Sequence, residues 1–589
     1  MKRLILYTTL ALAQLSFWHH DALALKYSSV ASGSFSSAAT WLGGSIPPVN
    51  FNAGDTIIID NGHNVILDQD ITLTHTLAQL DVRGILRSSG SEYINFNGSG
   101  ILSVSGTLDI DSIAFVNVTN ANITGQCTIK KVRCLIFSAS GSGTFTVTER
   151  LHVYGSISNT GGNTISLAPN TEIYMLGGEI IPTGTGIFTL PNSYDVIYTN
   201  SAHVKPTGIE ATGTGLRHVT VSLLSDTSEL KLGAGLELNN GTLNLVKGIL
   251  ALNNHDLRFG SNGDLSAAGA GKIKTTSASD IEVNVTNSLS GQLTFSANGN
   301  TVGDFIVNCG GPVKLGTALK VTGKVDLQNG KLDVQGNKLS LITGATINGA
   351  DANKYIITGT GGTLSADIGS GTSFTYHVGT AAQYAPCVIT SNNNTVYNGL
   401  NVGVNPGVKV FGTSGNDMAA TQPMVNATWF VTHSNPVVDI DMELMWHASM
   451  EVNSFDRGNA FISHLMGNYW DKDADKAATL NANGLYALKR AGIKSLSPFA
   501  IFDKNTVDVA NPAAKEEPAI YPNPAGETLY IRWDSTGTGI IVNSTGQVVK
   551  HLFLQKGENI IDIGALQPGV YYLGLSNEST NRGHRFVRQ

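Results

Sequence analysis

Pairs of acidic residues at strand spacing are the side chains of this sequence best suited to acid–base chemistry. Asp109 and Asp111 are separated by one residue, as are Asp68 and Asp70. Residues two apart on a β-strand lie on the same face, so each pair would present two carboxylates together. Such pairs can bind calcium or abstract a proton. Outward carboxylates also keep a β-sheet surface soluble, and we favour this simpler explanation.

Two further groups could do chemistry. The run at 471–475, DKDAD, places three carboxylates at the spacing of a calcium-binding loop, but no glutamate completes an EF-hand pattern. His152 and Glu172 are separated by about one coil of a repetitive fold and could meet as an acid–base pair on neighbouring coils. A solvated loop and a surface ion pair explain the same residues without any activity.

Established catalytic and metal-binding motifs are missing. The sequence has no nucleophile elbow, phosphate-binding loop, H-E-x-x-H helix or C-x-x-C metal pair. Cys127 and Cys134 could bridge a short loop in an oxidising space, although small buried side chains explain all four cysteines better. The other two are Cys309 and Cys387. We therefore predict no catalytic residue, no metal ligand and no cofactor.

Three tyrosines form the most distinctive candidate for binding. Tyr154, Tyr174 and Tyr198 recur at intervals close to the length expected of one coil. If the preceding residues all pointed inward, stacking of coils would align the three rings on an outer face, about 5 Å apart per coil. Exposed rings suit the apolar faces of sugars. We take these tyrosines as a candidate glycan-contact strip, with a structural aromatic ladder as the alternative explanation.

The elements that would carry these residues are short β-strands. From 25 to 410, apolar residues alternate with polar ones in short runs that Gly, Asn and Ser turns separate. The pattern Leu243-x-Leu245 … Gly248-x-Leu250 reappears, with one constant offset, as Val325-x-Leu327 … Gly330-x-Leu332. Units of this kind bury their inner faces by stacking. We predict a right-handed parallel β-helix of roughly 15 coils, with a string of β-sandwiches as the alternative.

The opening of this region carries a resemblance of its own. Trp41-Leu42-Gly43-Gly44 is followed by Ala53-Gly54-Asp55-x-Ile57-x-Ile59. These residues look like the first coils of many exported bacterial β-helix proteins, and the resemblance covers only this opening part of the solenoid. It implies a fold and not an activity. Trp41 would cover the open end of the core.

Two segments with different residue patterns follow the solenoid. Within 411–503, Val438, Ile440, Met442, Leu444 and Trp446 alternate with polar residues and Met445, as in a half-buried antiparallel strand. We expect a small β-sandwich here. The stretch 504–518 is polar and poor in apolar side chains, so we expect it to be a linker.

The N-terminus has the three parts of a secretory signal peptide. Lys2 and Arg3 precede an apolar run, and Ala22-Leu23-Ala24 forms an A-x-A cleavage site. We predict a signal peptide at 1–24. Polar residues interrupt the apolar run, so we expect no transmembrane span there or later in the chain.

The last segment, 519–589, reads as a compact β-module with its own turns. Asn523-Pro524, Thr545-Gly546 and Pro568-Gly569 are turn signals between apolar strands. The segment resembles the type A C-terminal sorting domain of the type IX secretion system of certain Gram-negative bacteria. The residues that carry this sorting signal are Tyr521, Pro522, Asn523, Pro524, Gly546, Gly569, Tyr571 and Tyr572. We expect this segment to fold as an immunoglobulin-like β-sandwich, and the alternative to its sorting role is a plain domain of that fold with a packing role.

The resemblance implies handling by the type IX secretion machinery, passage through the periplasm, and delivery to the outer-membrane surface or the extracellular space. Only 14% of residues are charged and the net charge is −7, which argues against nucleic acid as a partner. We expect an all-β structural or adhesive surface protein, without enzymatic activity, that contacts carbohydrate or host-cell ligands. The alternatives are a polysaccharide-degrading β-helix enzyme, a lyase or hydrolase, and a calcium-dependent adhesion module.

Overall fold

The computed structural model describes residues 24–506, except 183–184, 201–204, 393–394 and 436–437. It also describes residues 519–576, except 534–535, and 581–589. The expected signal peptide at 1–24 and the expected linker at 504–518 lie outside these residues, apart from Ala24 and 504–506.

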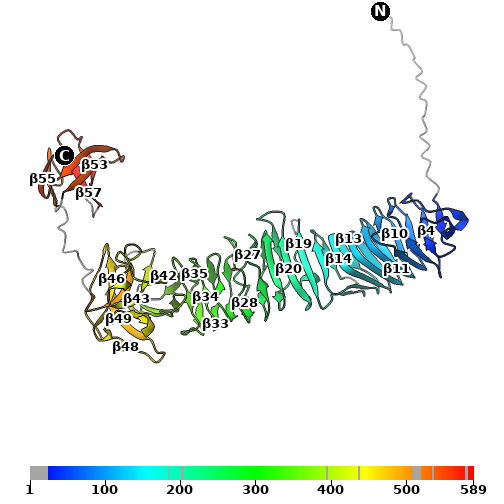
Figure 1. Cartoon of the computed structure of the whole chain (residues 1–589), viewed down its shortest axis with the longest axis horizontal. Helices are drawn as coiled ribbons and strands as arrows, with labels where there is room; N and C mark the ends of the chain where they lie inside the picture. The colour runs from blue at the N-terminus through cyan, green and yellow to red at the C-terminus, as the bar shows by residue number, and fades with distance from the viewer. Residues whose placement is uncertain are drawn as a thin grey trace, which may run out of the picture.

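The largest part of the chain is a parallel β-solenoid of about 15 turns, so the predicted all-β solenoid is confirmed. Strands β4 (Thr56–Ile59), β7 (Gln79–Val82) and β10 (Ile101–Val104) show the pairing, since each lies parallel to the next. Successive partners come from successive coils, as Leu80 on β7 and Leu102 on β10 do. The coils form the rod in Figure 1, from β4 near one end to β35 near the other.

One hydrophobic column fills the inside of the rod. Leu80 and Leu102 have no exposed surface, and the same holds for most inward residues of the solenoid. Phe96, Phe115 and Phe137 stack from coil to coil, with ring centroids 5.6 and 4.3 Å apart. Each coil exposes its inner face until the next coil covers it, so the core is continuous.

Four strands carry the region that matters most below. They are β9 (Tyr93–Phe96), β11 (Thr107–Phe115), β13 (Gln126–Gly141) and β14 (Thr144–Asn159). Each pairs in parallel with the next. The last two strands are long because they continue around corners of the coil, with register shifts between Ile129 and Lys131 and between Cys134 and Ile136. A corner can therefore add or remove a residue without breaking the ladder.

Parallel pairing changes to antiparallel pairing at β38 (Thr363–Ile368). This strand lies parallel to β35 (Lys338–Leu341) and antiparallel to β42 (Tyr397–Pro406). The change falls before the expected boundary at residue 410, because the last coil shares a sheet with the β-sandwich that follows. That sandwich covers the otherwise open strand edges at this end of the solenoid.

The sandwich contains the alternating strand that the sequence indicated. In β44 (Ile440–Trp446), Ile440, Met442, Leu444 and Trp446 are buried and the residues between them are half-buried. β44 lies in a second sheet with β39 (Ser373–Tyr376), β41 (Cys387–Ser391), β48 (Thr479–Leu480) and β49 (Tyr486–Ile493). The first sheet continues from β42 through β43 (Met424–Thr432) and β50 (Pro498–Asp503) to β46 (Ala460–Met466) and β47 (Tyr469–Trp470).

The C-terminal domain has a core of its own. One sheet contains β51 (Ala519–Tyr521), β52 (Thr528–Trp533) and β55 (Gly557–Asp562). The other contains β54 (Val548–Leu554), β53 (Gly537–Asn543), β56 (Gly569–Ser576) and β57 (Asn581–Arg588). Their inner residues form a hydrophobic cluster separate from that of the solenoid and sandwich.

Candidate functional site

A groove of about 700 Å³ crosses four successive coils on the outside of the solenoid. Each coil contributes outward residues of one strand, β9, β11, β13 or β14 in turn, and in the first two coils also the residue directly after the strand. In that order the outward residues are Tyr93, Asn95 and Asn97; Ser112, Ala114 and Val116; Lys131, Arg133 and Leu135; and Arg150, His152 and Tyr154.

Differences in side-chain size create the hollow. Ser112 is aligned with Tyr93 on one side and with Lys131 on the other. Ala114 is aligned in the same way with Asn95 and Arg133. A coil with small outward residues therefore lies between two coils with larger ones. We call this row of Ser112, Ala114 and Val116 the trough.

One side of the trough is strongly basic. Lys131, Arg133 and Arg150 line the groove, and we call these three residues the basic wall. Lys131 pairs with Asp111 at 3.3 Å, and Arg150 pairs with Glu172 at 2.9 Å. Neither carboxylate lines the groove.

Arg133 differs from the other two cations of the basic wall. Among the described residues no carboxylate oxygen lies within 4.0 Å of its guanidinium nitrogens. It donates a hydrogen bond to the Tyr154 hydroxyl at 3.1 Å, and its central carbon lies 5.6 Å from the centre of that ring. The arginine therefore holds the tyrosine in place and keeps its charge at the surface.

His152 lies at the centre of the fourth coil of the groove. Burial lowers its pKa below the ordinary value, and the positive charges of Arg133 and Arg150 lower it further, against an opposing effect of Glu172. Its ring stacks on Tyr174 with centroids 4.5 Å apart. The imidazole is therefore neutral near pH 7, and it would gain a proton more easily if an anion entered the groove.

The three tyrosines of the expected glycan strip do not form one column. Tyr154 is 37% exposed, but Tyr174 is aligned with His152, and Tyr198 is aligned with Met175 inside the core. Tyr198 is only 1% exposed. Tyr198 follows Tyr174 in the sequence by one residue more than the length of the coil between them. A shift of one residue turns a side chain to the opposite face of a strand, so Tyr198 points inward.

Tyr198 instead belongs to a buried polar cluster. Its hydroxyl donates to Glu210 Oε1 at 2.8 Å, and Glu210 is 1% exposed. The Tyr194 hydroxyl donates to the Glu210 backbone oxygen at 3.0 Å. Burial, followed by the charge of Glu210, raises the pKa of Tyr198. The cluster therefore stabilises a corner of the coil and has no surface for a glycan.

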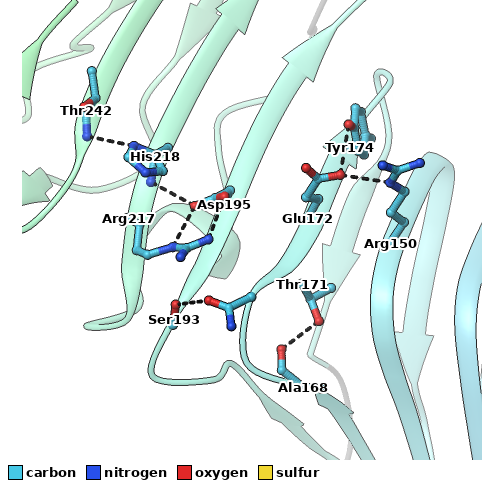
Figure 2. Close-up of polar contacts among 11 residues, drawn as sticks. Arg150, Ala168, Thr171, Glu172, Tyr174, Ser193, Asp195, Arg217, His218 and Thr242 are labelled. Atoms are coloured by element: carbon cyan, nitrogen blue, oxygen red, sulfur yellow. Dashed lines mark hydrogen bonds and ion pairs between the residues drawn. The ribbon is translucent and has the colours of Figure 1, made fainter.

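The expected acid–base pair is not formed either. Glu172 is aligned with Arg150 and not with His152. Its Oε2 accepts hydrogen bonds from Arg150 at 2.9 Å and from the Tyr174 hydroxyl at 3.1 Å, as Figure 2 shows. Glu172 thus neutralises one end of the basic wall.

The acidic pairs are explained by local structure. Asp109 is exposed, whereas Asp111 is buried at a corner, so the two do not share a face. Burial by itself raises the pKa of Asp111, but hydrogen bonds from Ser112 and Lys131 and the charges of Lys131 and Lys130 outweigh it and lower the pKa. An anion held in this way is a weak base.

Asp68 and Asp70 bind backbone. Asp68 accepts hydrogen bonds from the backbone and hydroxyl of Ser36, and Asp70 accepts one from the Tyr93 backbone at 3.0 Å. Both carboxylates therefore fix neighbouring coils in register.

The three carboxylates of 471–475 each have a basic partner. Arg490 binds both oxygens of Asp471, at 2.7 and 2.6 Å. Lys476 pairs with Asp473 at 3.3 Å, and Lys472 pairs with Asp475 at 3.8 Å. The described part of the chain contains no cluster of three or more His, Cys, Asp or Glu side chains that could hold a metal ion.

All four cysteines are free and buried. Burial raises the pKa of Cys127 and of Cys134, the latter to about 12, so neither thiol is reactive near neutral pH. Both fill space in the solenoid core.

One residue of the sorting signal, Asn523, holds the two ends of the C-terminal domain together. Asn523 donates to the Arg585 backbone oxygen at 3.2 Å and accepts from the Val587 backbone at 2.9 Å. The peptide bonds before Pro522 and Pro524 are cis. Gly546 has a φ of 85°, which suits its tight turn between β53 and β54.

Three of the remaining sorting residues lie in β56, and the fourth, Tyr521, ends β51. Gly569 begins this strand, Tyr571 lies in the core, and Tyr572 is exposed. The Tyr571 hydroxyl donates to the Gln567 backbone oxygen at 2.8 Å. Tyr521 is exposed and stacks on Tyr530 with centroids 5.5 Å apart.

The comparisons with known proteins support the assignment of the C-terminal domain as a sorting domain. Residues 519–589 match the family model of the secretion system C-terminal sorting domain. The chain is therefore a β-solenoid protein with a type IX secretion sorting domain, and this domain implies export to the cell surface or the extracellular space. No helix among the described residues has the length and apolar character needed to cross a membrane.

No curated protein matches the chain. One solved structure is similar over 35% of this chain, with 11% sequence identity and a TM-score of 0.13. It is the structure of PorZ, an essential bacterial surface component of the type-IX secretion system of Porphyromonas gingivalis, and this chain spans 37% of its length. A likeness this weak supports no conclusion about function.

Sequence reasoning missed the basic wall. Lys131, Arg133 and Arg150 are scattered in the chain, and only the register of β13 on β14 brings them together. The available signal was the repeated alternation of a cation with a buried residue, as in Lys131-Val132-Arg133. Without the length of each coil, that signal does not say which neighbours a cation has.

Proposed function

We propose that this protein is an exported structural or adhesive rod that contacts glycans through the groove across β9, β11, β13 and β14. The observation that carries the proposal is the groove itself, an open hollow lined by cationic, amide and aromatic side chains on the flank of a molecule that bears an export domain. A solenoid supplies a long rigid surface and needs no reactive group to bind a partner.

The side chains of the groove suit carbohydrate. Tyr93 and Tyr154 are 38% and 37% exposed and offer apolar ring faces. Asn95 and Asn97 offer amide groups that can donate to and accept from sugar hydroxyls. A mixture of aromatic faces and a few polar groups is what orients a small polar ligand in a binding site.

The test is binding of the purified chain to an array of glycans, followed by an assay for released reducing sugar on each bound glycan. We expect binding without release. The double substitution of Tyr93→Ser and Tyr154→Ser should weaken binding by about tenfold, because two stacking faces are lost. Tyr469→Ser, which removes an exposed tyrosine of the sandwich, is the matched control and should change nothing.

Three results would contradict the proposal. If no glycan binds, or if the double variant binds as well as the parent, the groove is not a carbohydrate site. Release of reducing sugar that the double variant lacks would favour the polysaccharide-degrading enzyme instead.

A further inference from the structure

We propose that the groove is specific for acidic glycans, whose carboxylate or sulfate groups lie on the basic wall while the sugar chain follows the trough across the long axis of the rod. This inference rests on the proposed function, since it specifies the class of glycan that the same groove binds. The experiment below therefore includes neutral glycans, which separate the loss of acidic selectivity from the loss of glycan binding.

The first support is the sign of the local charge. The groove lining includes three cationic side chains and no aspartate or glutamate. The chain as a whole has a net charge of −7, so the basic wall is a local reversal of sign and not a general property of the surface. A concave surface of one charge concentrates and steers ligands of the opposite charge.

The second support is the state of each cation. Arg133 is exposed and has no ion pair among the described residues, and its planar guanidinium can bind a carboxylate or sulfate with two hydrogen bonds. Lys131 and Arg150 have ion pairs but keep 41% and 51% of their side-chain surface exposed. Arg133 can therefore bind an anion in the trough without giving up an ion pair, and the exposed surfaces of Lys131 and Arg150 add positive charge beside it.

The third support is the shape of the groove. The trough lies one coil from Tyr93 and one coil from Lys131, so its walls stand roughly 10 Å apart. Its floor of Ser112, Ala114 and Val116 follows β11 and the residue directly after it, and this direction is perpendicular to the stacking of the coils. An extended chain lying on this floor would pass the basic wall on one side and the amides of β9 on the other.

The same features argue against a single-stranded nucleic acid. Such a partner needs aromatic platforms for successive bases next to a basic track. Tyr93 and Tyr154 lie on the first and fourth coils, about 15 Å apart in the stacking direction, with small side chains on the coil next to Tyr93. Two isolated rings at this separation suit sugar faces at the ends of a site better than a stack of bases.

The test measures equilibrium binding of the purified chain to two matched pairs of polymers. One pair is polygalacturonate and its methyl ester, and the other is dextran sulfate and dextran. Within each pair the backbone is shared and the charge differs, so the two arms distinguish carboxylate from sulfate. We expect at least one acidic polymer to bind tenfold or more tightly than its neutral partner, and this preference to shrink as salt is added.

Two outward substitutions test the site directly. Arg133→Gln should weaken binding of the acidic polymer about tenfold, and binding of the neutral polymer much less, because only the support of the Tyr154 ring is lost there. Ala114→Trp fills the trough without changing its charge and should abolish binding of both polymers. Should the tryptophan lower the melting temperature, the smaller Ala114→Gln replaces it and should weaken binding of both.

Each substitution has a matched control outside the groove. Lys320→Gln removes one positive charge from an exposed position of β32 (Leu319–Val321) and should not affect binding. Thr220→Trp adds the same ring in the same outward column as Ala114, which the strand registers trace through Arg133, His152, Tyr174 and Ile197 to Thr220. It should also leave binding unchanged.

The remaining outcomes decide against the inference in different ways. Equal affinity for acidic and neutral polymers, blocked by Ala114→Trp, would overturn the acidic specificity and keep the proposed function. Binding that Ala114→Trp does not reduce, or no binding at all, would overturn both. Tighter binding of a single-stranded DNA oligonucleotide than of either acidic polymer would replace the glycan with a nucleic acid.

Discussion

Two neighbouring stretches of the same solenoid flank use their outward positions in opposite ways. We call the stretch of β9, β11, β13 and β14 the groove flank. We call the next three strands, β16 (Thr171–Met175), β19 (Tyr194–Thr199) and β20 (Leu216–Ser222), the paired flank. One outward column runs through both, and its members are Tyr93, Ser112, Lys131, Arg150, Glu172 and Asp195.

On the paired flank the charges are neutralised by their neighbours. Figure 2 shows Asp195 binding Arg217 through both carboxylate oxygens, at 3.1 and 2.9 Å, and Glu172 shared by Arg150 and Tyr174. On the groove flank the column is first uncharged and then basic, and no carboxylate of the described residues lines the groove. The inward residues of both flanks are equally buried. The outward columns of such a rod can therefore differ from coil to coil while the buried columns stay the same.

The largest expected effect comes from reversing one charge on each flank. Arg133→Glu should weaken binding of an acidic polymer by about 100-fold or more, because it removes a charge-assisted hydrogen bond and adds repulsion. Arg217→Glu should leave that affinity unchanged and instead destabilise the fold by about 1 kcal/mol, since two carboxylates would face each other. Titration calorimetry and chemical unfolding measure the two effects. Equal losses of affinity in the two variants would mean that only the total charge of the rod matters.

A smaller effect should follow when the groove flank is made to resemble the paired flank. Ala114→Asp places a carboxylate in the trough beside Arg133, as Asp195 lies beside Arg217. We expect acidic polymer to bind about tenfold more weakly, because the new ion pair competes for the arginine. Neutral polymer should bind nearly as before, which separates this variant from the tryptophan that blocks the trough. An unchanged affinity for acidic polymer would show that Arg133 does not contact it.

The sequence predicted the solenoid because its signal is local. Alternating apolar residues and the repeat of Leu243 and Leu250 in Val325 and Leu332 indicate stacked strands, and all four side chains are buried as expected. The sorting domain was equally accessible, because its motifs lie close together in one short segment.

The candidate site was not predictable in the same way, since it depends on how many residues each coil contains. Tyr198 points into the core because the coil between Tyr174 and Tyr198 is one residue shorter than the number of residues that separates them in the sequence. The alignment of Ser112, Lys131 and Arg150 depends on coil length, because each of the two coils between them is as long as the spacing of these residues in the sequence. Other coils differ in length, and the coil from Leu80 to Leu102 is longer. Corners absorb such changes without altering the alternation of the strands, so the pattern of apolar residues does not reveal them.

The affinity for an acidic polymer should also change by about threefold with pH, because His152 gains a proton as the pH falls. Its lowered pKa keeps it neutral near pH 7, beside Arg133, Arg150, Glu172, Tyr154 and Tyr174. A bound anion favours the protonated ring, so affinity should rise as pH falls from about 7 to about 5.5. Dextran sulfate is the right probe, since its sulfates stay charged over this range.

The variant His152→Asn isolates this titration from that of the other histidines. Its binding should vary less with pH than that of the parent. Without ligand, the stability of the fold should change with pH in the opposite direction. The unfolded chain takes up the proton first, near pH 6.5, because the pKa of His152 is lowered in the folded chain. The parent should therefore lose stability relative to the variant as the pH falls below that value. If the binding affinities of parent and variant depend on pH in the same way, His152 does not take part in binding.

The smallest effect is expected at the border between the two flanks, where Glu172 pairs with Arg150. Glu172→Gln keeps an acceptor for Arg150 and Tyr174 but removes the negative charge nearest to the basic wall. Acidic polymer should then bind about twofold more tightly, while the fold loses about 0.5 kcal/mol, as is usual for an exposed ion pair. The control Glu229→Gln breaks the pair with Lys274 outside the groove and should cost similar stability without any gain in affinity. If Glu172→Gln leaves the affinity unchanged, the bound anion lies near Lys131 and Arg133 and does not extend to Arg150.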